Sequence, residues 1–116
     1  MTVLIVEDNA AMRRVIRSVI SDLAEVVECS DGAQALSAYE QSRPDWVLMD
    51  VRMGEVNGIQ ASRQIRAAYP AARIIIVTDY DDTVLREAAR AAGASHYVLK
   101  ENLFEIRRLI SGPGIL

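Results

Sequence analysis

At 116 residues, the chain is long enough for one domain with its own core, and its 51% apolar and 25% charged residues are ordinary for a soluble globular protein. No apolar run approaches the roughly 20 residues of a membrane span, and no signal peptide precedes the first strand-like run, so we expect a cytoplasmic protein. A net charge of −3 argues against a broad nucleic-acid-binding surface within these residues.

The first half of the chain alternates short apolar runs with segments of helical periodicity. Val3–Val6 is an apolar run closed by two acids, which is typical of a buried strand with a polar end. After Asn9 the apolar residues recur at the spacing of an amphipathic helix, and Asp31 with Gln34 has the spacing of a capping box. The predicted elements are a strand at 3–6, a helix that carries the apolar residues Met12 to Leu23, a strand at 25–29 and a helix through about Gln41.

The second half contains Trp46–Met49, four consecutive apolar residues that end in Asp50. This run is too short for a helix and predicts a strand buried on both faces, as in a parallel sheet. A carboxylate at the carboxyl end of such a strand is a candidate for chemistry, because ligands bind at that edge of open α/β sheets. The later predicted elements are a helix that Gly58 opens and Pro70 stops, a strand at 74–77, a helix capped by Asp81–Thr83 and ended by Gly93, a strand at 96–99, and a last helix that starts with the capping-box pattern Asn102–Glu105 and fades at Gly112.

This order of elements predicts the fold class. Five strands that alternate with five helical patterns indicate an α/β protein, with parallel strands, right-handed crossovers and helices on both faces of the sheet. Periodicity does not distinguish between the several doubly wound strand orders.

Polar residues follow four of the predicted strands, namely Glu7 and Asp8, Asp50, Thr78 and Lys100. Each alone has a structural explanation as a helix cap or a solvated charge, but capping does not explain why they meet at one edge of the sheet. Clustered carboxylates repel, so we expect a bound divalent cation with oxygen ligands, Mg²⁺ above others. A carboxylate oxygen can then attack phosphorus and form an aspartyl phosphate, because the metal and Lys100 offset the charge of the incoming phosphoryl group.

The same residues, in this order, resemble the receiver domain of bacterial two-component response regulators. The resemblance covers essentially the whole chain and implies the flavodoxin-like fold, a doubly wound five-stranded parallel sheet with strand order 2-1-3-4-5 and five helices. We expect one receiver domain over residues 1–111, with residues 112–116 as the start of a linker or tail. The motifs that carry the resemblance are Glu7-Asp8, Asp50 followed by Met53 and Gly58, Thr78, Tyr97 and Lys100.

The resemblance also implies a role for each site residue. Asp50 would accept a phosphoryl group from a histidine kinase, and Thr78 and Lys100 would contact the phosphoryl oxygens. Tyr97 would change rotamer together with Thr78, so that phosphorylation alters the surface around the fourth helix and the fifth strand. The expected Mg²⁺ ligands are Asp8 directly, Glu7 largely through water, Asp50, and the backbone carbonyl of Arg52.

The sequence is most like receivers joined to a helix-turn-helix transcriptional output domain, which implies phosphorelay signal transduction that regulates transcription. DNA binding would then come from a C-terminal output domain outside this chain, and we expect no membrane partner. A stand-alone receiver and a homodimer, through the first and fifth helices or through the fourth-helix face, are left open. Gly54, Asp79 and Glu101 depart from the family pattern. Two of them are expected to modulate the site: Gly54 replaces a proline and loosens its loop, and Asp79 adds negative charge beside Thr78.

Two other functions remain open at this point. Asp79 and Gly54 are compatible with a degenerate receiver that acts as a phosphorylation-independent interaction module. The second alternative function is a Mg²⁺-dependent phosphohydrolase with an aspartyl intermediate. Against it, no second Asp stands two residues after Asp50 to serve as a general acid. We therefore expect a signalling domain that promotes only its own phosphotransfer and dephosphorylation, and not an enzyme.

Overall fold

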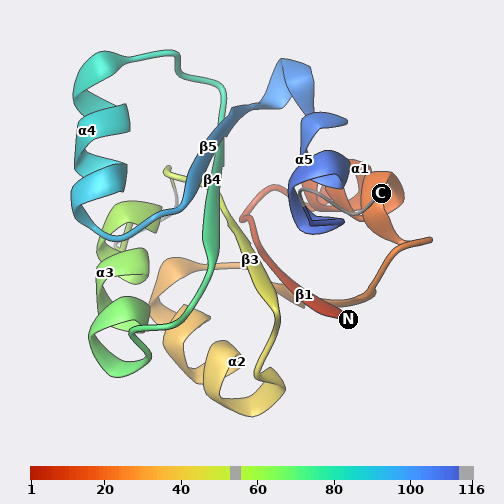
Figure 1. The fold of residues 1–116 in the computed structure, drawn as a ribbon, viewed down its shortest axis with the longest axis horizontal. Helices are drawn as coiled ribbons and strands as arrows, with labels where there is room; N and C mark the ends of the chain where they lie inside the picture. Colours follow the sequence, from red (N-terminus) through yellow and green to blue (C-terminus); the bar gives the residue numbers. More distant parts are fainter. Residues whose placement is uncertain (53–55, 113–116) are drawn as a thin grey trace.

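The computed structural model describes residues 1–52 and 56–112, which form a five-stranded parallel sheet with helices on both faces (Figure 1). The strand order is β2-β1-β3-β4-β5, and every neighbouring pair is parallel, so the expected doubly wound fold is confirmed. The strands are β1 (Thr2–Val6), β2 (Glu25–Cys29), β3 (Trp46–Met49), β4 (Ile74–Thr78) and β5 (His96–Leu99).

The helices are α1 (Ala10–Ile20), α2 (Ala35–Ser42), α3 (Gly58–Ala68), α4 (Thr83–Ala91) and α5 (Glu105–Ile110). Helices α1 and α5 pack on one face of the sheet, and α2, α3 and α4 pack on the other (Figure 1). Short 3-10 turns, Gly32–Gln34 and Lys100–Asn102, precede α2 and α5. Among the helices of the described residues, none combines the length and the apolar run that a bilayer crossing requires.

The sheet is buried from both sides, which explains its continuous apolar runs. Successive residues of β1 point to opposite faces, so that Leu4 and Val6 join the core under α2 and α3, while Val3 and Ile5 join the core under α1 and α5. Every residue of β3 and β4 is buried. A strand covered on both faces needs apolar residues at every position and therefore shows no alternation.

Side-chain caps fix where the helices begin. The Asn9 side chain accepts a hydrogen bond from the Met12 backbone N–H at 2.9 Å and starts α1. At the start of α3, Asn57 and Gln60 form a reciprocal capping box. The Asp82 side chain caps α4 by accepting from the first two backbone N–H groups that follow Thr83, and Gly93, with φ +100°, ends that helix as predicted.

Some predicted boundaries differ from the structure, and two of these lie at the ends of α1 and α5. The capping box predicted at Asn102 is wrong: α5 begins at Glu105 and has no side-chain cap hydrogen bond. Asn102 already lies within the 3-10 turn that follows β5, whereas a capping residue needs extended backbone. Helix α1 ends at Ile20, before the last apolar residue of its predicted pattern, Leu23, which still packs against the same core.

Candidate functional site

Three carboxylates converge at the carboxyl edge of the sheet. Glu7 and Asp8 follow β1, Asp50 follows β3, and one oxygen of each lies within 4.8 Å of the others. The backbone N–H of Asp50 donates to the Val6 carbonyl at 3.0 Å, so the pairing of these two strands continues into the site. Glu7 is 1% exposed and Asp50 6% exposed, whereas Asp8 lies at the surface. The sequence prediction that these three acids meet is therefore confirmed in the geometry.

Lys100 supplies the balancing positive charge from the end of β5. Its Nζ atom lies 2.8 Å from Glu7 Oε1 and 3.4 Å from Asp50 Oδ1, and its side chain is only 10% exposed. One ammonium group thus faces two buried carboxylates. Because charges out of water interact strongly, this group holds the two carboxylates together and leaves the cluster with excess negative charge.

The surroundings of Asp50 change its pKa. Burial and the charge of Glu7 raise the pKa of Asp50 to about 6, and Lys100 only partly opposes them. Burial by itself would lower the pKa of Lys100, but the bond to Glu7 and the charges of Asp50 and Asp79 raise it above its ordinary value. Lys100 therefore stays protonated, while Asp50 ionises close to neutral pH.

The donor set fits a hard divalent cation. All three acids offer oxygen, which Mg²⁺ prefers, and a cation beside them would relieve the repulsion that raises the pKa of Asp50. The exposed Asp8 carboxylate leaves this position open to solvent. The cluster can therefore hold a metal ion and still admit a further ligand.

Gly58 positions the segment that follows Asp50. Its backbone N–H donates to the Val51 carbonyl at 2.8 Å, and a Cβ atom built on Gly58 would lie 1.8 Å from the Asp50 carbonyl oxygen. The start of α3 thus packs directly on the backbone of Asp50, and only glycine permits that approach.

Thr78 and Tyr97 are linked through one residue, Tyr80. The Thr78 hydroxyl, which is buried at the end of β4, accepts a hydrogen bond from the Tyr80 N–H at 3.3 Å. The Tyr97 hydroxyl donates to the Tyr80 carbonyl oxygen at 2.6 Å. The predicted pair is therefore not in direct hydrogen-bond contact, but both members hold the backbone of the same loop.

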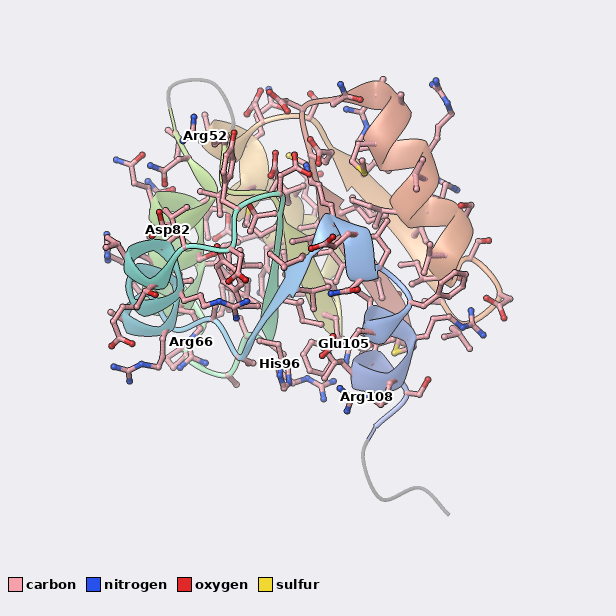
Figure 2. All side chains as sticks on the ribbon, turned by 90° about the horizontal axis from the view of Figure 1, so that it is seen from above. Arg52, Arg66, Asp82, His96, Glu105 and Arg108 are labelled. Atoms are coloured by element: carbon pink, nitrogen blue, oxygen red, sulfur yellow. The ribbon has the colours of Figure 1, made fainter. Side chains whose placement is uncertain are left out.

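A cavity of about 360 Å³ opens above the acids and is lined by Glu7, Asp8, Asn9, Ala11, Met12, Val15, Asp50, Arg52, Asp79, Tyr80 and Lys100. At its mouth the Arg52 guanidinium lies 4.3 Å from the centre of the Tyr80 ring, a cation–π contact between the β3–α3 and β4–α4 loops. Figure 2 shows Arg52 on one side of the molecule and His96 and Arg108 on the opposite side.

The sequence did not predict one residue of this site, Tyr80. Tyr80 was not expected there; its aromatic ring two residues after Thr78, in the loop that follows a strand end, is the signal that could have found it. Arg52 and Asp79 line the cavity, but the Arg52 carbonyl as a metal ligand and Asp79 as a modulating charge both stay predictions. Gly54 and Met53 lie outside the described residues.

The relatives of this chain agree with the fold. Over 119 residues it is 34% identical to the transcriptional regulatory protein YhcZ of Bacillus subtilis, covering 97% of this chain and 56% of that protein. Over 100 residues it is 35% identical to the chemotaxis protein CheY of Thermotoga maritima, covering 84% of this chain and 83% of that protein. The chain thus spans about half the length of the curated transcriptional regulators that it matches.

A crystal structure of a LuxR-family two-component response regulator from Aurantimonas sp. SI85-9A1 superposes with a TM-score of 0.89 and 33% identity, covering 95% of this chain and 81% of that one. A LuxR-family DNA-binding response regulator from Staphylococcus aureus superposes with a TM-score of 0.87 and 25% identity, covering 95% of each chain. The family described as the response regulator receiver domain matches residues 3–111, so the chain belongs to the response regulator receiver domain family.

Proposed function

We propose that this receiver domain accepts a phosphoryl group on Asp50 from a histidine kinase and switches its surface in response. The observation that supports this most directly is the buried Asp50 carboxylate, which lies close to two other acids and to the Lys100 ammonium and lines the cavity. Lys100 lines this cavity and would contact the transferred group. The Thr78 hydroxyl, which is buried at the end of β4 and accepts from the Tyr80 N–H, would have to turn toward the group to contact it.

The residues of the site divide the chemistry between them. An ionised Asp50 oxygen attacks phosphorus, a new O–P bond forms, and the donor's imidazole nitrogen leaves with the bonding electrons and takes up a proton. With a pKa of about 6, Asp50 is mainly carboxylate above neutral pH, as the attack requires. Asp8, Glu7 and Asp50, with the carbonyl of Arg52, would hold Mg²⁺, which supplies charge neutralisation for the phosphoryl oxygens.

The relatives support a place for the domain in transcriptional control. Two of them are transcriptional regulatory proteins about twice as long as this chain, so we propose a C-terminal DNA-binding output domain outside these residues. We propose a receiver domain over residues 1–111 followed by a linker or tail at 112–116, a cytoplasmic location and a histidine kinase as partner, with no direct nucleic-acid contact by these residues. A homodimer of this domain is a further proposal, and the sedimentation coefficient in solution tests it.

The domain is proposed to act only on its own aspartyl phosphate. A phosphohydrolase with an aspartyl intermediate needs a general acid near the leaving group. The residue two positions after Asp50 is Arg52, whose guanidinium does not release a proton in proteins and here packs on Tyr80. This geometry favours a signalling domain over an enzyme that turns over external phosphate esters.

Intact mass after incubation with acetyl phosphate and Mg²⁺ tests the proposal. The wild type should gain the mass of one phosphate, and neither Asp50→Asn nor the wild type with EDTA should gain it. If the folded wild type binds Mg²⁺ and gains no mass, the domain is instead a phosphorylation-independent interaction module.

Asp79 is proposed to slow this reaction. Its carboxylate lines the cavity and adds negative charge where the phosphoryl group must enter. Asp79→Ala should therefore be phosphorylated faster than the wild type by acetyl phosphate. Glu25→Ala, which removes an exposed acid at the opposite edge of the sheet, is the matched control for net charge. Equal rates for Asp79→Ala and the wild type would refute the role.

A further inference from the structure

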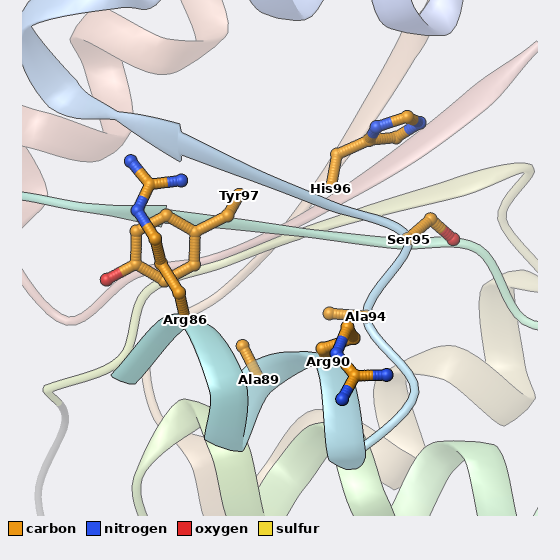
Figure 3. Close-up of a pocket in the computed structure, with 7 residues that line it drawn as sticks. All are labelled: Arg86, Ala89, Arg90, Ala94, Ser95, His96 and Tyr97. Carbon is orange, nitrogen blue, oxygen red and sulfur yellow. The ribbon is translucent and has the colours of Figure 1, made fainter. Parts of the chain in front are cut away.

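Arg86 joins three elements beside the site. Its Nε and Nη2 atoms each lie 3.1 Å from Asp81 Oδ1 in the β4–α4 loop. Its guanidinium carbon lies 4.5 Å from the centre of the Tyr97 ring on β5, and Figure 3 shows the guanidinium over that ring. One side chain of α4 thus contacts both the loop that follows Thr78 and the aromatic residue of β5.

The contacts of Tyr97 continue toward the phosphoryl site. Its hydroxyl is held by the Tyr80 carbonyl, and the Tyr80 N–H in turn donates to Thr78 Oγ1. Arg86 packs on the ring of the same tyrosine. A continuous series of contacts therefore runs from the buried Thr78 hydroxyl through Tyr80 and Tyr97 to Arg86.

Arg90 lies one turn further along α4 and provides an internal comparison. It forms an ion pair with Glu87 of its own helix, and its side chain is 73% exposed. Figure 3 shows Arg90 turned away from the Tyr97 ring. The two arginines thus share a helix and a charge, but in the part of the chain that the structure describes only Arg86 packs on Tyr97.

We propose that Arg86 is a positioning residue that holds Tyr97 and carries the effect of phosphorylation at Asp50 to the α4–β5 surface. This inference rests on the proposed function. If Thr78 turns toward a phosphoryl group, its bond to the Tyr80 N–H changes, and the carbonyl that holds Tyr97 moves with the same loop. Movement of Tyr97 then breaks or remakes its stacking with Arg86, which shifts α4 between two arrangements.

Amide NMR spectra recorded with and without beryllofluoride and Mg²⁺ test the inference, because beryllofluoride mimics the phosphoryl group without turning over. In the wild type and in Arg90→Ala, amide signals near Asp50 and along Thr83–Ala91 should shift. In Arg86→Ala, the signals near Asp50 should shift as in the wild type, while the shifts along α4 should fall to half or less. The mass gain with acetyl phosphate should be the same in all three proteins.

The two proposals fail in different ways. If the wild type gains neither phosphate mass nor signal shifts near Asp50, the proposed function is wrong and the role of Arg86 falls with it. If the amide signals along α4 shift as much in Arg86→Ala as they do in the wild type, only the role of Arg86 is overturned. Asp81→Ala, which removes the other contact of Arg86, should also reduce the signal shifts along α4, and it tests the same role if Arg86→Ala does not fold.

Discussion

Replacing Asp50 with Asn should stabilise the metal-free protein by an amount that depends on pH. Burial and the charge of Glu7 raise the pKa of Asp50 to about 6 from an ordinary value of 3.8. A carboxyl group whose pKa is higher in the folded protein binds more protons when folded, so its ionisation destabilises the fold. Its stabilising contribution is complete below its unfolded pKa and is lost as the pH rises through about 6.

The expected magnitude follows from this shift. A rise of about two pKa units corresponds to about 3 kcal/mol, because each unit is worth about 1.4 kcal/mol. Asp50 is 6% exposed, so solvent screens little of this energy. Relative to the wild type, Asp50→Asn should therefore gain about 3 kcal/mol in free energy of unfolding at pH 8 and roughly half of that at pH 5. The attraction between Asp50 and Lys100 is already contained in the pKa of about 6, so only the replacement of a neutral carboxyl group by an amide adds an offset that is independent of pH.

Urea unfolding followed by circular dichroism in EDTA, at several pH values between 5 and 8, measures the difference. Glu25→Gln removes an exposed carboxylate far from the site and should show no such trend. Excess Mg²⁺ should reduce the difference in free energy of unfolding between Asp50→Asn and the wild type, because its binding stabilises the folded wild type. A difference between Asp50→Asn and the wild type that is equal at pH 5 and pH 8 would refute the reasoning.

Substitutions at three further residues test packing and capping by urea unfolding. Ser62→Ala should raise the free energy of unfolding by about 1 kcal/mol, because the fully buried Ser62 hydroxyl has no hydrogen-bond partner among the described residues; a loss of stability would reveal a partner. Gly58→Ala should cost more than about 2 kcal/mol, because its Cβ would collide with the Asp50 carbonyl oxygen; a neutral effect would mean that the loop yields easily. Asp82→Ala should cost about 1 kcal/mol through loss of the α4 cap, and Asp82→Asn, which can still cap, should lose much less.

The sequence by itself determined the elements and the edge at which the site lies. Apolar runs and helical periodicity depend on local backbone geometry, which repeats every two or 3.6 residues and can be read without knowing the fold. Because the strands are parallel, the acids after β1 and β3 and the lysine after β5 had to lie at the same edge of the sheet. The strand order came from the family resemblance and was confirmed. The last helix was misplaced because a 3-10 turn and a capping box present the same residue types.

Only the tertiary structure decided the energetics of the site and its connection to α4. The raised pKa of Asp50 depends on its burial and on Glu7 and Lys100, which are supplied by two other strands. Likewise, the contacts of Tyr97 with Tyr80 and Arg86 join residues from separate elements, and no spacing within one element predicts them. Burial and cross-element contacts are set by how the whole chain packs, so they become visible only when the helices lie on the sheet.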